Sequence, residues 1–431
     1  MSAWGRKIVL ILLPIIGPLS GSKPIPSSRI YPSALNKPSV ESIKPTFANP
    51  LDSILRTTAA LASVVRQPDK YELQVIYTRI NRDAQRRPIF TQYSHRLNER
   101  AYFNPASLVK LPVAVLALEK LNRLRQYTPQ LTRASIMVTG AAGRCQTPVP
   151  FAAPPDSDRV ASVGNYIKRM LLVSDNQAYN RLYEFLGQQY LHGRLVQLGL
   201  PRVRITRRFA PCDTAANRCT NPISFYNATG TLLYTQPAAC NPHPLAPPLG
   251  RITKGRAYQV GGKIVLQPYD FTTANYLPLQ AVNDLLQRVL FPEVSPGSKA
   301  LQLSTADYAF LQKYLGSTPA ESGFKPLASR QYFPAYKKYL YYGRQPKAES
   351  QLGLRIYNIV GMSHGFLSDC AYFSDSKTGV EFMLSAVLYV NSDETINDGK
   401  YEYQTTGLPF LSALGKTLYA YEKAQMRLKA R

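Results

Sequence analysis

The chain has 431 residues, a formal net charge of +26, 34 prolines and five cysteines. Its lysines and arginines are dispersed, without a basic helix or arm, which argues against nucleic acid as a partner and favours a cationic surface near an anionic cell envelope. Of the four histidines, His192, His243 and His364 are scattered and lack metal-site spacing relative to the cysteines, and neither a metal nor an organic cofactor is expected.

The N-terminal residues 1–22 are predicted to be a secretory signal peptide. Arg6 and Lys7 precede an apolar run from Ile8 to Ile16, which is short for a bilayer span, and small residues around Ser22 suit cleavage. An uncleaved anchor is the alternative. Residues 23–46 are rich in proline and are interpreted as a flexible leader. We therefore expect a periplasmic or secreted monomer with no stable membrane span after cleavage.

Residues 47–431 are predicted to form one catalytic domain. The periodicity of apolar residues predicts, in order, a helix over 50–66, a hairpin over 71–82 and 88–97, a buried helix after Ser107, helices within 163–200, an irregular stretch over 205–268, helices over 277–290 and within 306–340, strands over 355–373 and 380–391, and a final helix over 408–429. Strands thus occur early and late, with helices between. This order predicts an α+β fold whose antiparallel sheet combines the N- and C-terminal segments, with an all-helical subdomain inserted at about 107–345. A cleft between sheet and helices is a natural site.

The pair Ser107 and Lys110 lies at the start of the buried helix. Residues three apart share a helix face, so the lysine amine can take the proton of the serine hydroxyl. The same spacing recurs at Ser20/Lys23, Ser322/Lys325 and Ser374/Lys377. Only Ser107 follows an Asn104-Pro105 helix start and leads into a helix that is apolar nearly all round. The alternative is that Lys110 extends its amine to solvent.

A second motif, Ser174-Asp175-Asn176, separates two helical runs. Serine, aspartate and asparagine are favoured helix caps, so a plain cap is the alternative interpretation. Together with Ser107/Lys110, however, the motif resembles the serine β-lactamase and penicillin-binding protein superfamily, and most closely the class A β-lactamases and related serine hydrolases. The resemblance spans roughly residues 50 to 425 and implies a β-lactamase/transpeptidase-like fold.

The resemblance also implies roles for these residues. Ser107 is the expected nucleophile and Lys110 the general base. Ser174 passes a proton to the leaving nitrogen, and Asn176 holds a substrate amide. Asp175 is expected to be structural, tying the loop to nearby backbone.

The third motif of the superfamily, Lys-Thr-Gly, has a literal copy at Lys377-Thr378-Gly379. It precedes a strand and is interpreted as a hairpin turn. The position expected on the cleft strand is Ser363-His364-Gly365, where Gly365 lets substrate approach the backbone. The backbone N–H groups of Ser107 and Phe366 are the predicted oxyanion hole.

Two departures from the family limit the expected activity. Ser363 stands where the family has a lysine, which removes a cation for a substrate carboxylate; a protonated His364 would partly replace it, and a solvent-facing His364 is the alternative. The stretch from Arg204 to Pro211 has no carboxylate where class A enzymes carry the glutamate that activates water. Asp213 is the nearest and is interpreted as a turn residue. Deacylation is therefore expected to be slow or to use Lys110.

The five cysteines fit an exported protein. Cys212 and Cys219 bracket a short polar loop and are expected to close one disulfide; Cys145 and Cys240, both in proline-rich loops, are expected to close another. Cys370 lies in an apolar strand-like run and is the expected buried free thiol.

These observations predict an exported serine hydrolase with an acyl-serine mechanism on a small-molecule β-lactam or a related amide such as an envelope peptide. The main alternative is a peptidoglycan D,D-peptidase or transpeptidase-like enzyme. A low-turnover envelope-binding protein on the same fold is the alternative outside enzymes.

Overall fold

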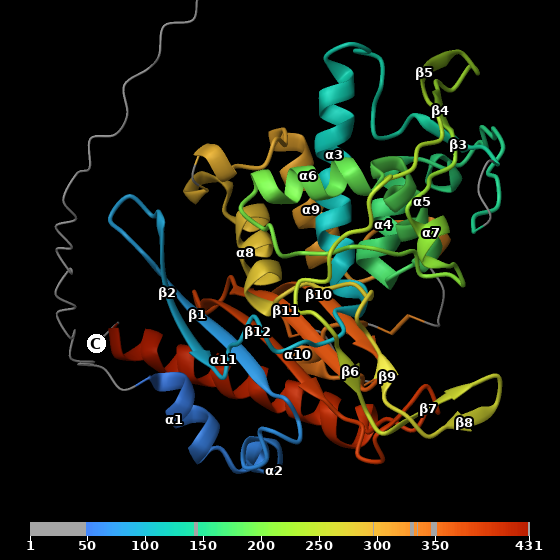
Figure 1. The fold of residues 1–431 in the computed structure, drawn as a ribbon. Helices are drawn as coiled ribbons and strands as arrows, with labels where there is room; N and C mark the ends of the chain where they lie inside the picture. The colour runs from blue at the N-terminus through green and yellow to red at the C-terminus, as the bar shows by residue number, and fades with distance from the viewer. Residues whose placement is uncertain are drawn as a thin grey trace, which may run out of the picture. The chain divides into compact units, whose positions relative to one another are not determined.

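A five-stranded antiparallel sheet forms the centre of the structure (Figure 1). The computed structural model describes residues 49–141, 145–295, 297–327, 332–333, 335–345 and 351–429, so the predicted signal peptide and leader lie outside the described residues. The strand order is β10-β11-β12-β1-β2. The strands are β1 (Gln74–Arg82), β2 (Pro88–His95), β10 (Leu354–Ser363), β11 (Phe366–Asp375) and β12 (Glu381–Tyr389).

The N- and C-terminal segments meet in this sheet as predicted, because β1 pairs antiparallel with β12. The prediction of one strand over 355–373 is wrong. His364 and Gly365 both have positive φ, 53° and 83°, and form the two-residue turn of a hairpin between β10 and β11. Such turns match the natural twist of paired strands, and a histidine at a positive φ gives no clear signal in the sequence.

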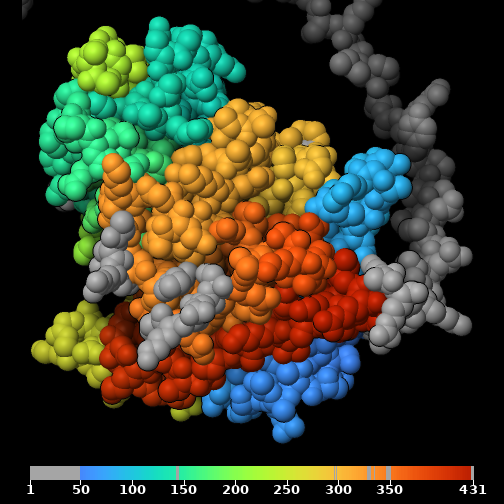
Figure 2. All heavy atoms as spheres, turned by 180° about the vertical axis from the view of Figure 1, so that it is seen from behind, coloured from blue at the N-terminus to red at the C-terminus, as the bar shows by residue number. Residues whose placement is uncertain are grey.

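Each face of the sheet is covered by helices, because side chains alternate between the faces along every strand. On β1, Val75 and Tyr77 pack into one core, and Ile76 and Ile80 into the other. The first core lies against α11 (Leu408–Lys429), and Figure 2 shows α11 in red along this side, with the blue N-terminal helices beside it. The remaining helices on this side are α1 (Pro50–Thr57), α2 (Ala62–Val65) and α10 (Tyr339–Tyr342).

Two of the predicted helices can be compared directly with these. The last helix has the predicted bounds. The helix predicted over 50–66 is interrupted, because Thr58 is extended with ψ 108° and Ala59–Leu61 forms a 3₁₀ turn.

The other face carries the inserted helical part, around α3 (Lys110–Arg125), whose residues 110–119 are all buried and which rises from the sheet in Figure 1. The helices packed against it are α4 (Val163–Val173), α5 (Asn176–Leu186), α6 (Gln188–Gln197) and α8 (Leu279–Leu290), and α9 (Thr305–Gly316) packs against α4 and α8. A short helix, α7 (Thr214–Asn217), follows in the loop region. The predicted α+β architecture is thus confirmed. Single turns of 3₁₀ or π helix lie at Ala106–Val109, Ser157–Arg159, Pro292–Val294, Gly297–Lys299, Lys325–Leu327 and Tyr403–Gly407.

The insertion is not all-helical, which corrects the prediction. A small antiparallel sheet combines β3 (Ile136–Thr139), β4 (Ile223–Tyr226) and β5 (Leu232–Gln236). Further short strands are β6 (Thr253–Lys254), β7 (Ala257–Val260), β8 (Lys263–Val265), β9 (Tyr269–Asp270) and β13 (Thr395–Ile396). Strands of two to five residues between prolines are too short for their alternation to be recognised in sequence.

The disulfides join Cys145 to Cys212 and Cys219 to Cys240, so the predicted pairing is wrong. The helix α7 fills the space between Cys212 and Cys219, and the backbone of Cys219 instead pairs with that of Cys240 across two adjacent segments. Cys370 is buried and free, as predicted. Within the described part of the chain, every helix is too short or too polar to cross a membrane.

Candidate active site

Ser107 lies in the 3₁₀ turn Ala106–Val109 that leads into α3. The side chain of Asn104 accepts a hydrogen bond from the backbone N–H of Ala106 at 2.9 Å, and Ala106 has a positive φ of 44°. A non-glycine residue held in this region is strained, and the capped turn maintains it. As a result, Leu108 points into the core while Ser107 stays partly exposed at the helix start.

Lys110 is the first residue of α3 and is fully buried, with 0 % exposure, so its amine does not extend to solvent. Its Nζ lies 3.0 Å from Ser107 Oγ, 2.9 Å from Ser174 Oγ and 2.8 Å from Asn176 Oδ1. It also donates to the carbonyl oxygen of Ser174. The structure thus brings together the four residues predicted from the two motifs.

The environment of Lys110 favours its neutral amine. Burial lowers its pKa well below the ordinary value of 10.5, and the charge of Lys337 lowers it further, while Asp175 acts in the opposite direction. The acceptors around Nζ are neutral oxygens, so no carboxylate bonds directly to it. A neutral amine 3.0 Å from a serine hydroxyl is the arrangement that general-base activation requires.

Ser174 ends α4 in the left-handed conformation, with φ 61° and ψ 38°. This conformation turns both its carbonyl and its hydroxyl toward Lys110, and the hydroxyl donates to Ser107 Oγ at 2.7 Å. Asp175 caps α5 by accepting from Ala178 N at 3.0 Å and pairs with Arg169, the structural role expected for it. The motif is therefore a helix cap at Asp175 and part of the polar network at Ser174 and Asn176.

A cavity of about 230 Å³ opens above Ser107. Four segments and the side chain of Asn176 line it: the turn at 104–107, the loop at 207–210, the stretch at 269–275, and the end of β10 with its turn. Met362, Ser363 and His364 are the contributions of β10 and its turn. The structure therefore places Ser363 and His364 beside Ser107.

Gly365 and Phe366 lie behind the cavity rather than on its lining. Gly365 is buried, and its N–H donates to the hydroxyl of Tyr403 at 2.8 Å. Phe366 is the first residue of β11, paired in the sheet with Ser363 and Tyr389, and its side chain is 1 % exposed. Gly365 is the second residue of the hairpin turn and Phe366 is the first residue of β11, and these positions place both residues behind the lining. The sequence did not show where β10 ends and β11 begins.

His364 packs against aromatic rings rather than facing solvent. Its ring lies 5.7 Å from that of Tyr269 and 5.4 Å from that of Phe271, between centroids, and Nδ1 is within hydrogen-bonding distance of Ser363 Oγ and Asn104 Nδ2. Burial, with the charge of Arg207, lowers the pKa of His364 to about 4. His364 is therefore neutral near pH 7 and does not supply the cation expected of it.

Arg207 supplies a cation to the lining that sequence reasoning missed. Its side chain is partly exposed, and the ion pairs found among the described residues do not include it. The only signal in the sequence was its place in the stretch that lacks a carboxylate.

The loop at 207–211 places apolar side chains on the cavity, in the stretch that has no carboxylate. Phe209 and Ala210 line the cavity, and the Phe209 ring lies 5.2 Å from Lys110 Nζ. The nearest carboxylate along the chain, Asp213, accepts from Ala216 N at 2.7 Å and caps α7, which is the turn role predicted.

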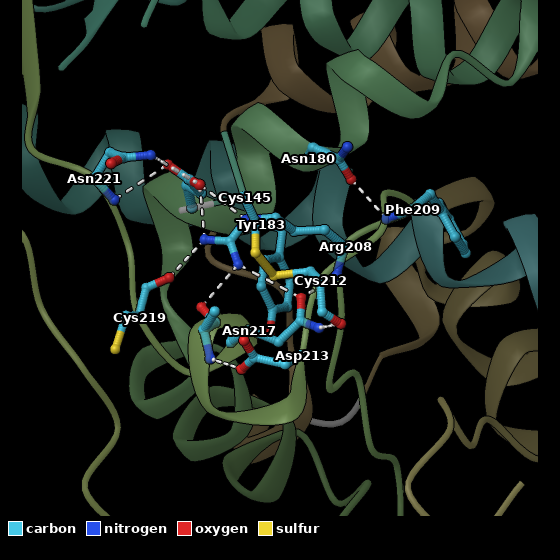
Figure 3. The surroundings of a disulfide bond; sticks show 12 residues. Cys145, Asn180, Tyr183, Arg208, Phe209, Cys212, Asp213, Asn217, Cys219 and Asn221 are labelled. Atoms are coloured by element: carbon cyan, nitrogen blue, oxygen red, sulfur yellow. Dashed lines mark hydrogen bonds and ion pairs between the residues drawn. A yellow bond between two sulfur atoms is a disulfide. The ribbon is translucent and has the colours of Figure 1, made fainter. Parts of the chain in front are cut away.

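An ion pair, hydrogen bonds and a disulfide hold the loop at 207–211 in place (Figure 3). The buried Arg208 guanidinium pairs with Glu184 at 2.7 Å and donates to the carbonyl of Cys219. Asn180 accepts from Phe209 N at 2.7 Å. The Cys145–Cys212 disulfide joins the loop to a second segment just beyond.

The literal Lys377-Thr378-Gly379 motif forms the turn between β11 and β12, and its interpretation as a turn is confirmed. The Asp375 carboxylate accepts from Lys377 N at 2.8 Å and Thr378 N at 3.3 Å, and Gly379 has φ 73°. None of the three residues lines the Ser107 cavity.

A larger cavity of about 710 Å³ lies beside α4 and α5. Its lining includes Arg159, Arg169 and Arg181, of which the first two pair with Asp156 and Asp175. No serine or cysteine is among its described lining residues, whereas Ser107 lines the smaller cavity.

Comparison with known proteins agrees with the motifs. Residues 60–239 match the model of the Beta-lactamase2 family, described as a beta-lactamase enzyme family, which confirms the resemblance to this superfamily of serine hydrolases. No curated protein matches the chain.

Several solved structures are similar to this chain. A β-lactamase from Desulfarculus baarsii DSM 2075 is 13 % identical, with 85 % of this chain and 98 % of that chain covered and a TM-score of 0.44. A β-lactamase from Sphaerobacter thermophilus DSM 20745 is 11 % identical, with 86 % and 97 % covered and a TM-score of 0.44. The protein PBP-A is 14 % identical, with 87 % and 97 % covered and a TM-score of 0.45.

Proposed function

We propose that this chain is an exported serine hydrolase that forms an acyl-enzyme at Ser107 with a β-lactam or a related amide. The observation that carries the proposal is the buried Lys110 amine, 3.0 Å from Ser107 Oγ at the floor of a cavity. Ser174, 2.7 Å from the same oxygen, completes a path for the proton.

Acylation proceeds in two balanced stages. Ser107 Oγ forms a bond to the substrate carbonyl carbon while its proton passes to Lys110 Nζ and the carbonyl electrons move to the oxygen. When the carbon–nitrogen bond breaks, the leaving nitrogen takes the proton of Ser174 Oγ, and the Lys110 ammonium returns a proton to Ser174 over 2.9 Å.

The negative oxygen formed in the first stage requires N–H donors. We assign one to the backbone of Ser107, at the start of α3. For the second we favour β10 over Phe366, because β10 is an edge strand whose residues Met362 and Ser363 line the cavity. An edge strand presents unpaired N–H groups along its outer side.

Hydrolysis of the acyl-enzyme is slow in this proposal. The described lining of the cavity contains no carboxylate that would activate water, and Lys110 is the remaining base. Arg207 takes the place of the missing strand cation and binds an acidic group of the substrate.

Export is supported by the two disulfides, since such bonds persist in oxidising compartments. The periplasmic or secreted location, the cleaved signal peptide and the monomeric state remain predictions.

The test is the mass of the intact protein after exposure to a fluorescent penicillin. We expect an adduct whose mass equals the whole penicillin, because opening the β-lactam ring loses no atoms. The adduct should be absent from Ser107→Ala. If neither β-lactams nor activated esters label the folded protein, the acyl-serine proposal is wrong.

A peptidoglycan D,D-peptidase or transpeptidase is the second candidate, favoured by the absence of a carboxylate in the described lining. Release of D-alanine from a peptide ending in D-Ala-D-Ala, together with long-lived penicillin labelling, would select it. Rapid hydrolysis of penicillin without peptide cleavage would select a β-lactamase. The complete hydrogen-bonded network around Lys110 argues against a pure binding protein.

A further inference from the structure

A second buried lysine, Lys337, lies next to the network of Lys110. Lys337 is 6 % exposed, and its Nζ donates to the backbone carbonyl of Leu171 at 3.0 Å. Among the described residues no carboxylate pairs with it within 4.0 Å. Burying an ammonium without a carboxylate partner is costly, so this position calls for a physical explanation.

The carbonyl bound by Lys337 belongs to the last turn of α4. Leu171 precedes Ser174 by three residues, and Lys110 donates to the carbonyl of Ser174 itself. Carbonyls at a helix C-terminus have no partner within the helix and carry partial negative charge. Two amines from different elements therefore bind the end of α4 that presents the Ser174 hydroxyl.

The charged groups around Lys337 come from three elements. Lys110 lies on α3, Lys338 is the next residue along the chain, and Asp369 lies on β11. The Asp369 carboxylate bonds to Asn358 Nδ2 at 2.8 Å and Leu340 N at 3.0 Å rather than to Lys337.

The groups around Lys337 and Lys110 disfavour a positive charge on both amines at the same time. Burial lowers the pKa of Lys337 to about 7, with Asp369 acting in the opposite direction. Asp369 itself is buried, which raises its pKa to about 7. The charge of Lys337 lowers the pKa of Lys110, and Asp175 is the acidic group that opposes this.

We propose that Lys337 is a positioning residue for acylation: its amine fixes the last turn of α4 beneath Ser174, and its charge disfavours a charge on Lys110. The base is thereby kept neutral and ready for the Ser107 proton. The strand position where the family carries a lysine is Ser363 here, so this chain takes its second amine from another element. The role rests on the proposed function, whereas the charge coupling is independent of it.

The experiment compares the pH dependence of penicillin labelling in the wild type and in Lys337→Met. Removing the neighbouring charge should raise the pKa of Lys110, so the acidic limb of the labelling rate should move up by about one pH unit. On that limb the rate should fall about tenfold at a fixed pH. An unmoved limb would overturn the proposal.

Lys338→Met is the matched control. Lys338 is an equally buried lysine, but its Nζ donates to Leu315 O, Ile356 O and Asn358 Oδ1, away from α4. The acidic limb of the labelling rate of Lys338→Met should lie at the same pH as that of the wild type. An equal shift in both variants would mean a general loss of packing and would also overturn the role of Lys337.

Lys337→Arg covers the case in which the methionine variant does not fold, as checked by circular dichroism. Arginine keeps its charge at every pH used. The limb of this variant should lie at or below that of the wild type, and a limb above it contradicts the proposal.

An NMR titration of isotope-labelled lysine, with Lys110 assigned from Lys110→Arg, reads the coupling without a substrate. Lys110 should titrate about one unit higher in Lys337→Met. If the wild type is not labelled by penicillin but this shift is present, the proposed function fails while the coupling of Lys337 to Lys110 stands. If Lys110 titrates at the same pH in both proteins, the coupling is wrong whatever the labelling shows.

Discussion

The floor of the Ser107 cavity and its walls are built in different ways. On the floor, the side chains of Ser107, Lys110, Ser174 and Asn176 bond mainly to one another, over distances of 2.7 to 3.0 Å. On the walls, a neutral His364, the cation of Arg207 and the apolar Ala210 face the same space without a shared network.

In the proposed acyl-serine mechanism, this difference separates two requirements that different parts of the fold meet: activation of the serine, and handling of the substrate. Activation of Ser107 depends on α3 and the α4–α5 junction, which pack against each other inside the helical part. Substrate choice and release of the acyl group depend on β10 and the loop at 207–211, more than 140 positions apart in the sequence by their numbers. Under the proposed function, the floor therefore supplies what acylation needs, while the walls set how long the acyl group stays and which acids bind.

The largest expected effect tests the floor. Ser107→Ala and Lys110→Met should each reduce the rate of penicillin labelling by about 10³-fold or more, because each removes a member of a unit that acts together. Stopped-flow fluorescence or timed gels would measure it. Ser374→Ala changes the serine of another Ser-x-x-Lys pair and should label like the wild type; a loss there would show that the assay does not report on this site.

The second prediction concerns the buried ion pair that supports the loop at 207–211 on the side away from the cavity. Glu184→Gln leaves the buried Arg208 guanidinium without its carboxylate and should lower the free energy of unfolding by about 3 to 5 kcal/mol, measured in urea. The matched control, Glu381→Gln, breaks the more exposed pair with Arg82 and should cost about 0 to 1 kcal/mol. Equal losses in the two variants would contradict a special role for the buried pair.

The third prediction concerns the pH dependence of stability. Because burial lowers the pKa of His364 from 6.5 to about 4, the unfolded chain binds the proton more readily between these values. The free energy of unfolding should therefore fall as pH drops from 6.5 toward 4, and His364→Gln should remove a part on the order of 2 kcal/mol. His192, with a pKa also lowered to about 4, accounts for part of the remaining slope.

Urea unfolding at several pH values would measure this slope. His243→Gln, at an exposed side chain, should keep the wild-type slope. A His364→Gln slope equal to that of the wild type would mean that the pKa of His364 is the same in the folded and unfolded chain, so burial would not disfavour its charged form.

The smallest effect separates two roles for Asp213. If Asp213 acts only as the cap of α7, Asp213→Ala should lower the free energy of unfolding by about 1 kcal/mol and leave the half-life of the acyl-enzyme unchanged. A much longer half-life would instead make Asp213 the base that activates water. Asp175→Ala, at the cap of α5, provides a comparison for the loss of a cap.

The sequence predicted the floor better than the walls for a physical reason. Ser107 and Lys110 share one helical turn, and Ser174 follows a helix with a clear periodicity, so local rules apply to each. The sheet was predictable too, since its strands are eight to ten residues long and rich in apolar residues. The turn at His364 and Gly365 was not, because a positive φ at a histidine is set by the strands on either side.

The prediction of the disulfide pairing was wrong for a similar reason. Cys212 and Cys219 are close in the sequence, but the four-residue helix between them sends each to a distant partner. The role of Lys337 was equally hidden, because nothing local connects it to Leu171, 166 positions away.

The disulfide between Cys145 and Cys212 joins the end of the 207–211 loop region to a second segment only after both thiols are oxidised. A thiol-rich compartment would keep the loop behind Arg207 and Ala210 untied, whereas an oxidising one closes the bond and fixes that side of the cavity. In an exported protein, as proposed, this bond forms after delivery, so a reductant added to the purified protein should change the lifetime and selectivity of the acyl group before it changes the reactivity of Ser107.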